Sequence, residues 1–329
     1  MKMRLFIFSS KRRRVAGLII AGILLLIVND QYITRLHRAD LSRRVNCLVM
    51  SPPQEFDVAV LGSSAGQLGI NTPELAESLE ARVLDLTSKG SAYPEQLLTL
   101  RLFLKRNKVK TLIFQVDDWG LTNSGYSYPF HEYEYLPFIS VPEVYESIAQ
   151  EYGTFVAGCW RWVPMLAYSQ YNQKIGIRTF HIARLAGISS NATYSSDAVN
   201  RIAAVLPSSG DPRFTDGPPV VPTLSNHRRQ CCERIIRLCR SDGVDVVLCI
   251  APVHVDWRRY HIGTDERAAW YRGIAKKYDV SVFESTIGVN SEDRHFFKDS
   301  SHLNGAGAAR FTQELSDFLL SRSSLDPAA

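Results

Sequence analysis

The sequence lacks the charge pattern of a nucleic-acid-binding protein. Its formal net charge is +5, but six of its 38 Lys and Arg residues lie within residues 1–29, where no acidic residue occurs. The remaining 32 basic residues are balanced by 33 acidic ones, so the rest of the chain has no basic surplus. Nucleic-acid binding needs a basic surface on the folded domain. We therefore expect no nucleic acid among its partners.

Cysteine is also scarce, and its spacing gives no metal-binding pattern. The chain has six cysteines, with no C-x-x-C pair and no Cys/His arrangement typical of zinc sites. Most of them lie in apolar helical or strand patterns, where buried free thiols are common. We expect neither a metal nor an organic cofactor, and the spacing identifies no disulfide.

The N-terminus combines a basic block with an apolar run and predicts membrane targeting. Four basic residues at 11–14 precede Val15–Val28, a run without a polar side chain. A full membrane span needs about 20 apolar residues, and Tyr32 and Ile33 extend the run toward that length. No small-residue cleavage site follows it. We expect an uncleaved signal anchor over residues 15–33, with a cleaved signal peptide as the alternative.

This anchor sets the expected topology of the chain. Residues 1–14 would form a basic tail that stays in the cytoplasm. Residues 34–55 are polar and are broken by SPPQEF, so they resemble a connecting stalk. Residues 56–323 would form the domain outside the cytoplasm. In a bacterium the protein would then be a single-pass inner-membrane protein with a periplasmic domain.

After the stalk, short apolar runs alternate with helical patterns. One helix begins at Thr72, with proline next and acidic residues in its first turn. Alternation of this kind predicts a parallel α/β sheet with helices on both faces. Residues 118–222, rich in aromatic residues and proline, interrupt the alternation and predict an inserted region of helices and loops. The predicted strands are Asp57–Gly62, Arg82–Thr87, Thr111–Val116, Val244–Val253 and Ser281–Ser285.

The segment GSSAG, residues 62–66, lies where the first strand ends and a helix should begin. Ligand sites in open α/β sheets lie beyond the carboxyl ends of the strands. A serine there has its hydroxyl near a helix N-terminus, where developing negative charge is stabilised. GSSAG also fits the G-x-S-x-G nucleophile pattern, with Ser64 in the middle. A simple turn of small residues is the structural alternative.

A second polar group lies near the C-terminus, in the segment DSSH at residues 299–302. A serine nucleophile needs a base, and the base needs a group that orients it. Asp299 and His302 are three residues apart, so on one turn both side chains can lie on the same face. His302 would then accept the proton of Ser64 while Asp299 orients the imidazole. A helix cap is the structural alternative for this segment.

Together these motifs resemble the GDSL or SGNH hydrolase family, over residues 56–116 and 223–320. The resemblance implies a flavodoxin-like sheet, and the insertion lies outside it. Matched position by position, Ser64 corresponds to the family's nucleophile. Asp299 and His302 correspond to its terminal Asp-x-x-His block. An α/β-hydrolase fits less well, because its nucleophile follows a central strand and its acid and histidine are usually far apart in sequence.

The resemblance also implies where an oxyanion would be stabilised. Gly90, in TSKGSAYP after the second strand, matches the family's glycine whose N–H binds the oxyanion together with the N–H of Ser64. The family's third donor is an Asn after the third strand, but this chain reads QVDDW at 115–119. Loss of one such donor can cost about 10²–10³ in rate. Asp117 and Asp118 would be available to bind a sugar hydroxyl, with helix capping as the alternative.

Two histidines remain outside these motifs. His254 follows the strand Val244–Val253 and could reach the same edge of the sheet, where it would contact substrate, cap a helix or pack. His131 lies in the inserted region among acidic residues, and we expect it to face solvent.

The predicted anchor narrows the comparison within this family. The arrangement looks like the extracytoplasmic SGNH-like proteins that accompany membrane-bound O-acyltransferases in the modification of envelope polysaccharides. It implies such an acyltransferase as a partner and a polysaccharide or acyl ester as substrate. An acyl group would pass to Ser64 and then to a glycan hydroxyl, or to water in an esterase. A non-catalytic binding or scaffold component of a polysaccharide complex is the alternative, favoured by the missing Asn.

Overall fold

The computed structural model describes residues 10–39, 44–122, 130–176, 218–288 and 293–323. The chain forms two compact units. The helical unit comprises Met1–Met50 and Glu132–Thr193, and the sheet unit comprises Ser51–His131 and Tyr194–Ala329. Each unit is described by itself.

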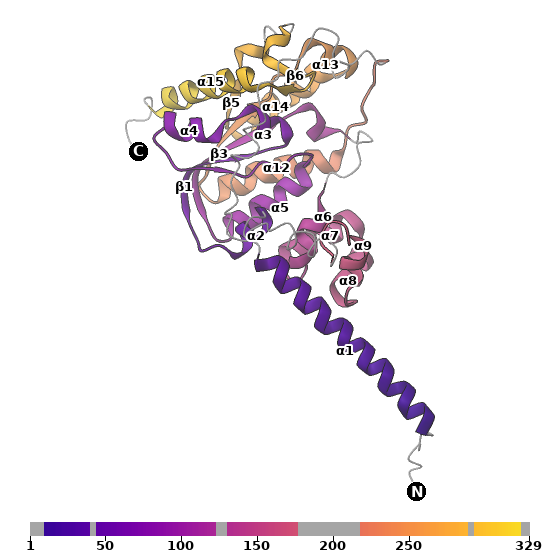
Figure 1. Cartoon of the computed structure of the whole chain (residues 1–329). Helices are drawn as coiled ribbons and strands as arrows, with labels where there is room; N and C mark the ends of the chain where they lie inside the picture. Colours follow the sequence, from indigo (N-terminus) through magenta and orange to yellow (C-terminus); the bar gives the residue numbers. More distant parts are fainter. Residues whose placement is uncertain (1–9, 40–43, 123–129, 177–217, 289–292, 324–329) are drawn as a thin grey trace. The chain divides into compact units, whose positions relative to one another are not determined.

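The sheet unit is built on a five-stranded parallel sheet with the order β2-β1-β3-β4-β5 (Figure 1). This is the flavodoxin-like strand order, and it confirms the predicted fold class. All five predicted strands are present, with bounds that differ by a few residues. The strands are β1 Glu55–Leu61, β2 Val83–Asp85, β3 Lys108–Val116, β4 Asp245–Ile250 and β5 Ser281–Glu284.

Helices cover both faces of this sheet, because strands buried on both sides carry apolar side chains in both directions. One face packs against α3, α4 and α15, and the other against α5, α12 and α14. Tyr93 of α5 meets Phe114 of β3 edge to face at 5.5 Å between ring centroids. These helices are α3 Ser64–Gly69, α4 Thr72–Ser78, α5 Tyr93–Leu104, α12 Asn226–Ser241, α14 Thr264–Tyr278 and α15 Gly305–Ser323.

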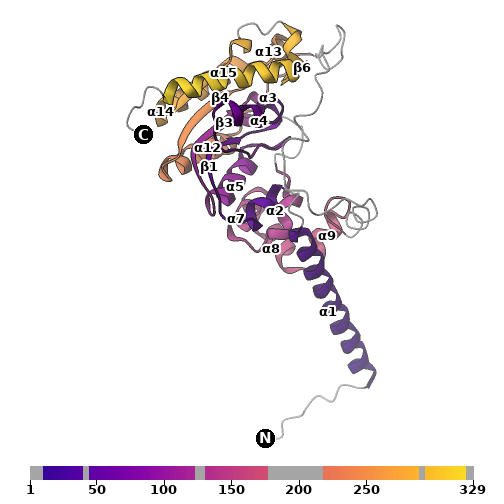
Figure 2. The same ribbon diagram turned by 60° about the vertical axis from the view of Figure 1, so that its left-hand side comes forward.

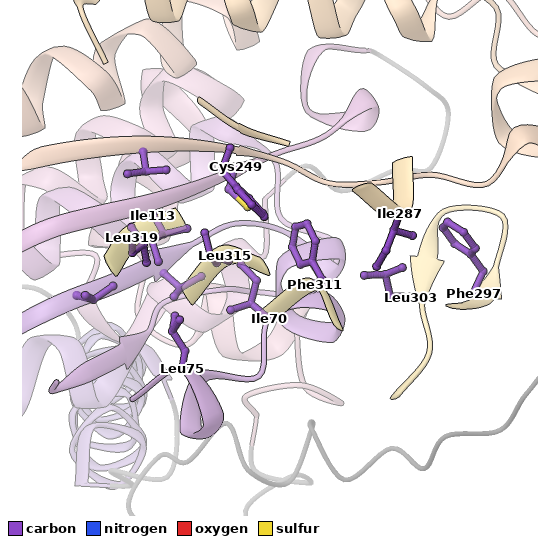
Figure 3. Packing of buried hydrophobic residues seen from close by; sticks show 14 residues of the cluster. Ile70, Leu75, Ile113, Cys249, Ile287, Phe297, Leu303, Phe311, Leu315 and Leu319 are labelled. Atoms are coloured by element: carbon purple, nitrogen blue, oxygen red, sulfur yellow. The ribbon is translucent and has the colours of Figure 1, made fainter. Parts of the chain in front are cut away.

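The face toward α15 contains a continuous apolar cluster (Figure 3). Ile113 and Cys249 come from neighbouring strands, and Phe311 and Leu315 come from the closing helix. The same cluster reaches Leu303, beside the candidate site, so the C-terminal segment is held against the sheet by apolar burial.

A short antiparallel hairpin precedes α15. Its strands are β6 Phe297–Asp299 and β7 His302–Leu303, and Asp299 pairs with His302. We expected Asp299 and His302 on one turn, but they lie opposite each other across a two-residue connection. The side chains still share a face, because directly opposed residues of an antiparallel pair point to the same side.

The helical unit begins with α1, Ser10–Ala39, a 30-residue helix. The segment 11–39 of this helix is long and apolar enough to cross a membrane, and an 18-residue stretch of it has a mean hydropathy of 1.8. Such a helix is compatible with a signal anchor and with a signal peptide. The remaining described helices of this unit are α2 Arg44–Met50, α6 Glu132–Tyr135, η2 Leu136–Phe138, α7 Pro142–Tyr152, α8 Thr154–Trp162 and α9 Leu166–Gln170.

The structure differs from the expected stalk at residues 34–55. Residues 34–39 continue α1, and α2 buries Val45 and Leu48. Ile33 and His37, one helical turn apart, are buried as well. Residues 34–39 and 44–50 are therefore packed within the helical unit rather than extended. The expected insertion is also divided: of its described residues, 118–122, 130–131 and 218–222 group with the sheet unit.

Candidate active site

The β1–α3 turn carries Ser63 and Ser64. Ser63 has extended backbone angles and is the N-cap of α3, where its hydroxyl accepts from Ala65 N–H at 3.2 Å. This is ordinary capping chemistry, and it fixes the helix start one residue after the cap. Ser64 is therefore the first helical residue and follows the carboxyl end of β1, which lies between β2 and β3 in the sheet.

Gln115 of β3 holds this turn in place. Its Oε1 atom accepts from Ser63 N–H at 2.9 Å and from Gly66 N–H at 3.1 Å. The close approach requires glycine at 62, because a Cβ there would lie 2.8 Å from the Cβ of Gln115. Sequence analysis did not identify Gln115 as a site residue. The sequence signal for it was the pair of glycines that flank the serines, which leave space for another side chain in this turn.

Ser64, His302 and Asp299 form a continuous hydrogen-bonded chain. Ser64 Oγ lies 2.8 Å from His302 Nε2, and His302 Nδ1 lies 2.8 and 3.0 Å from the two oxygens of Asp299. The structure thus brings together three predicted residues from opposite ends of the sequence. The side chains of His302 and Asp299 are 24% and 22% exposed, so the group is reachable from solvent.

Asp299 is arranged to remain a carboxylate. Burial opposes its ionisation, but the hydrogen bond and charge of His302 outweigh burial and lower the pKa of Asp299. The Ser301 backbone N–H and hydroxyl also donate to Asp299 Oδ1, at 3.0 and 3.2 Å. When Nδ1–H of His302 donates to this carboxylate, Nε2 is left to accept the proton of Ser64. Ser301 is a second residue that sequence analysis did not identify.

This geometry can activate a hydroxyl for attack on an acyl carbonyl. The nucleophile lies within hydrogen-bonding distance of the base, and the base lies within hydrogen-bonding distance of the group that orients it. The contacts of Ser64, His302 and Asp299 supply nucleophilic and acid–base chemistry. Among the described residues, no group of three or more His, Cys, Asp or Glu side chains is placed to hold a metal ion.

The loop that carries Gly90 is attached to the same turn. Ser88 N–H donates to Gly62 O at 3.0 Å, and the Ser91 hydroxyl donates to it at 3.2 Å. Gly90 lies between them with a φ of +77°, a left-handed conformation that strongly favours glycine. The loop after β2 therefore lies beside the residue that precedes the two serines.

Asp117 follows β3 where the family resemblance placed an Asn donor. Its Oδ1 accepts from Gly120 N–H at 2.8 Å and caps the short helix η1, Asp118–Leu121. Its Oδ2 accepts from the hydroxyl of Ser63 and from Gln115 Nε2. Asp117 is thus engaged in holding the turn together, and as a carboxylate it provides no proton for an oxyanion.

Asp118 and His254 are both buried and bonded internally. Asp118 accepts from His261, Arg267 and Trp257, so its carboxylate is committed to an internal network. His254 is 2% exposed, and its Nδ1 caps α13, Val255–Tyr260. The capping alternative accounts for His254, whereas Asp118 is held by its ion pair with Arg267 and does not cap a helix. We do not propose either as a substrate ligand.

His131 does not face solvent as expected. Its Nδ1 and its backbone N–H lie 2.8 and 3.1 Å from Oε2 of Glu95, whose side chain is fully buried. The His131 side chain is 21% exposed. The acidic neighbours in the sequence suggested a solvated surface, but the partner of His131 comes from α5, 36 residues away.

Three solved structures resemble this chain at low identity. A GDSL-like lipase from Bacteroides thetaiotaomicron is 10% identical with a TM-score of 0.38, and the match covers 81% of this chain and 88% of that one. A proposed platelet activating factor from Streptococcus pneumoniae is 12% identical with a TM-score of 0.39, covering 93% and 99%. A proposed acylhydrolase from Bacteroides fragilis is 9% identical with a TM-score of 0.41, covering 86% and 97%.

Comparison by sequence adds no relatives. No protein-family model and no curated protein matches this chain. The strand order and the Ser64, His302 and Asp299 contacts therefore carry the functional argument.

Proposed function

We propose that this protein is a serine acyl-transfer enzyme of the SGNH type. The observation that carries the proposal is the 2.8 Å contact between Ser64 Oγ and His302 Nε2, with Asp299 bonded to the opposite ring nitrogen. Ser64 Oγ attacks an acyl carbonyl while its proton moves to His302 Nε2. The proton then passes to the departing oxygen, which leaves an ester between the acyl group and Ser64.

The oxyanion of the tetrahedral intermediate needs N–H donors at the turn. Ser64 N–H lies at the start of α3, and Gly90 N–H belongs to the loop bonded to Gly62. We assign these two groups as donors, by the family resemblance and by the attachment of the loop. In the second half of the reaction, His302 removes a proton from water or from a sugar hydroxyl, and that oxygen attacks the carbonyl of the ester on Ser64. The ester bond to Ser64 Oγ then breaks, and His302 returns the proton to Ser64 Oγ.

We further propose that α1 is retained as a membrane anchor. Its last turns are bonded into the helical unit: Met165 N–H donates to Asp30 at 2.8 Å, and the hydroxyls of Thr34 and Tyr168 lie 2.6 Å apart. His37, on the same helix, is also bonded to a backbone oxygen of this unit. Cleavage after the apolar run would cut the helix beside these contacts, which supports an anchor over a cleaved signal peptide.

An anchored enzyme of this type would act outside the cytoplasm on a cell-envelope polysaccharide. The acceptor is a glycan hydroxyl in an O-acyltransferase and water in an esterase. A membrane-bound O-acyltransferase is the partner that would supply the acyl group in the transferase case. These assignments extend the chemistry of Ser64 and rest on the membrane anchor and the family resemblance.

A fluorophosphonate probe tests the chemistry directly. We expect the full-length protein in detergent to be labelled at Ser64, located by peptide mass spectrometry. Ser64→Ala should abolish labelling, whereas Ser63→Ala should keep most of it, because the Ser63 hydroxyl caps α3 and bonds Asp117 rather than the base. A wild-type protein that is folded but unlabelled would instead support the scaffold alternative, which the carboxylate of Asp117 in place of an Asn donor favours.

A further inference from the structure

An exposed apolar surface lies on α8 and on the turn that follows it. Phe155 and Trp162, at opposite ends of this helix, are 82% and 73% exposed. Cys159, four residues after Phe155 and three before Trp162, falls on the same helical side and is partly exposed. Val163 and Leu166 extend the surface into α9. We call Phe155, Cys159, Trp162, Val163 and Leu166 the α8 surface.

Hydrogen bonds place this surface beside the end of the apolar part of α1. Met165 N–H, at the start of α9, donates to Asp30, two residues after Val28. Two residues of helix correspond to about 3 Å along its axis. Tyr168 bonds to Thr34 farther along α1, so α9 leads away from the apolar part. Figures 1 and 2 both show α8 and α9 next to this end of α1.

We propose that the α8 surface inserts into the outer boundary of the lipid bilayer that α1 crosses. The proposal rests on the retained anchor proposed above. Aromatic side chains such as Trp162 are enriched at this depth, where an apolar body meets a hydrated polar region. Phe155 and Val163 would exchange contact with water for contact with acyl chains. The protein would therefore be held at the membrane by two elements, one that spans it and one that lies on it.

Arg161 gives this surface a charged edge. Its guanidinium lies 4.9 Å from the ring centroid of Trp162 and 5.1 Å from that of Tyr145. A side chain of this length can keep its charge in the headgroup region while its stem lies along apolar surface. The lipid favoured by this arrangement is an anionic phospholipid, whose phosphate an arginine can bind.

Photo-crosslinking of the full chain in nanodiscs tests this contact. We would place benzoyl-phenylalanine at position 155 or 162 and, as a control, at the exposed position Lys276 of the sheet unit. Phosphatidylglycerol mixed with phosphatidylcholine is the lipid. We expect lipid adducts at 155 and 162 at five or more times the control yield. Mass spectrometry of the intact chain first establishes that α1 is present.

Three other results would overturn the bilayer contact. They are yields equal to the control, adducts to other segments of the same chain, and adducts to a second protein in native membranes without lipid adducts. Loss of α1 from the purified chain would refute the retained anchor, and with it the bilayer contact, but would leave the Ser64 chemistry untouched.

A separate observation concerns His131, which lies against Gly90. A methyl group in place of one Gly90 hydrogen would lie 3.5 Å from His131 Cε1 and 3.6 Å from Nε2. Glu95 bonds the other ring nitrogen and the backbone N–H of His131. The bonds from Glu95 therefore fix the ring so that its Nε2 edge is presented at the proposed oxyanion glycine.

The geometry points to His131 Nε2–H as a third donor to the oxyanion, in place of the absent Asn. The assignment rests on the proposed serine chemistry. In the imidazolium form of His131 both ring nitrogens carry protons, so Nε2 can donate while Nδ1–H bonds Glu95. Asp117, the residue at the expected Asn position, is a carboxylate bonded to Ser63 and Gly120 and cannot replace that donor.

Rates with p-nitrophenyl acetate and with the fluorophosphonate probe test this assignment. We expect His131→Ala to lower kcat and the labelling rate by about 10²-fold with KM nearly unchanged, since it removes one oxyanion donor. Its Tm should also fall, because the buried Glu95 loses its bond to the imidazole. His131→Gln, whose amide N–H can donate, should recover at least part of the loss, about tenfold. Glu95→Gln should also lower kcat. The exposed His295→Ala is the matched control and should behave as wild type.

The outcomes distinguish the proposed serine chemistry of Ser64 from the assignment of His131 as an oxyanion donor. If wild type is labelled at Ser64 and His131→Ala reacts at the wild-type rate, His131 is not a donor and the serine chemistry stands. If His131→Ala loses stability and raises KM without a fall in kcat, its role is structural and the assignment is wrong. If folded wild type is not labelled at all, both proposals fall.

Discussion

Asp299 and His302 face each other across a two-residue connection, and each oxygen of the carboxylate lies within 3.0 Å of Nδ1. The hairpin therefore pairs the base with its orienting group through residues close in sequence. The contact of His302 with Ser64 joins segments more than 200 residues apart and depends on tertiary folding. That contact is secured by the burial of Leu303 and Phe311 against the sheet.

The first prediction concerns Asp299→Asn. The amide cannot stabilise an imidazolium and can favour the wrong tautomer of His302, so we expect kcat to fall by roughly 10²–10⁴-fold. Ser301→Ala removes one hydroxyl donor but keeps the backbone N–H to Asp299, and it should cost less than about tenfold. Ester hydrolysis measured with both variants tests this order. An equal loss in the two variants would contradict the assignment of Asp299.

The sheet was predictable because its signals are local. Apolar runs such as Thr111–Val116 and the capped start of the helix at Thr72 depend on residues close in sequence, and the structure has both elements. Burial of strands on both faces then requires helices on both sides. The pairing of Ser64 with His302 also followed, because both segments adjoin strand ends of one sheet.

Ser301, which the motifs did not single out, bonds Asp299 two residues away, but the contacts of Gln115 and His131 come from partners distant in the chain. In the sequence, Gln115 looks like any other strand residue. Its amide reaches the backbone of the turn because β3 pairs with β1. His131 appeared solvated among acids, and only folding brings the buried Glu95 to it. The hydroxyl of Thr34 likewise bonds Tyr168 of α9, more than 100 residues later, which a polar local composition cannot reveal.

The second prediction tests the role of Gln115. Gln115→Leu removes the acceptor of Ser63 N–H and Gly66 N–H and should destabilise the fold by about 1–3 kcal/mol for each buried donor left unpaired. Activity should fall as well, because Ser64 is displaced. Thermal melts and labelling rates measure the two effects.

Gly62→Ala provides a steric test of the same contact. The added Cβ would lie 2.8 Å from the Cβ of Gln115, and overpacking of this kind costs about 1–3 kcal/mol. Gly273→Ala is the control, because a Cβ at Gly273 meets no atom within 4 Å and a helix interior favours alanine. Equal Tm values for the two alanine variants would contradict the close approach at Gly62.

The third prediction concerns acid stability. Burial opposes ionisation of Asp118, but hydrogen bonds from His261 and Arg267 outweigh it and lower its pKa below 3.8. A group with a lowered native pKa stabilises the fold above its unfolded pKa, and that stability is lost as pH falls through the native pKa. Wild type should therefore lose stability below about pH 4, where the unfolded chain takes up the proton first.

Asp118→Asn should change both the level and the slope of this stability. It leaves Arg267 buried without its counter-charge, so we expect a loss of about 3–5 kcal/mol at pH 7. The remaining decline below about pH 4 should be shallower. Asp265→Asn is the control, since its pair with Arg258 is largely exposed and should contribute less than about 1 kcal/mol. Urea unfolding between pH 3 and pH 7 measures the difference.

The fourth prediction concerns the cysteines, all six of which are free thiols. Burial raises the pKa of Cys239 to about 12 and raises that of Cys249 and Cys232 further. Since the thiolate is the reactive form, these positions and the buried Cys231 should resist iodoacetamide in the native protein. Cys47 and Cys159, which are partly exposed, should react. Mass spectrometry should find two alkylated sites in detergent and six after unfolding without a reductant; fewer than six would reveal a disulfide.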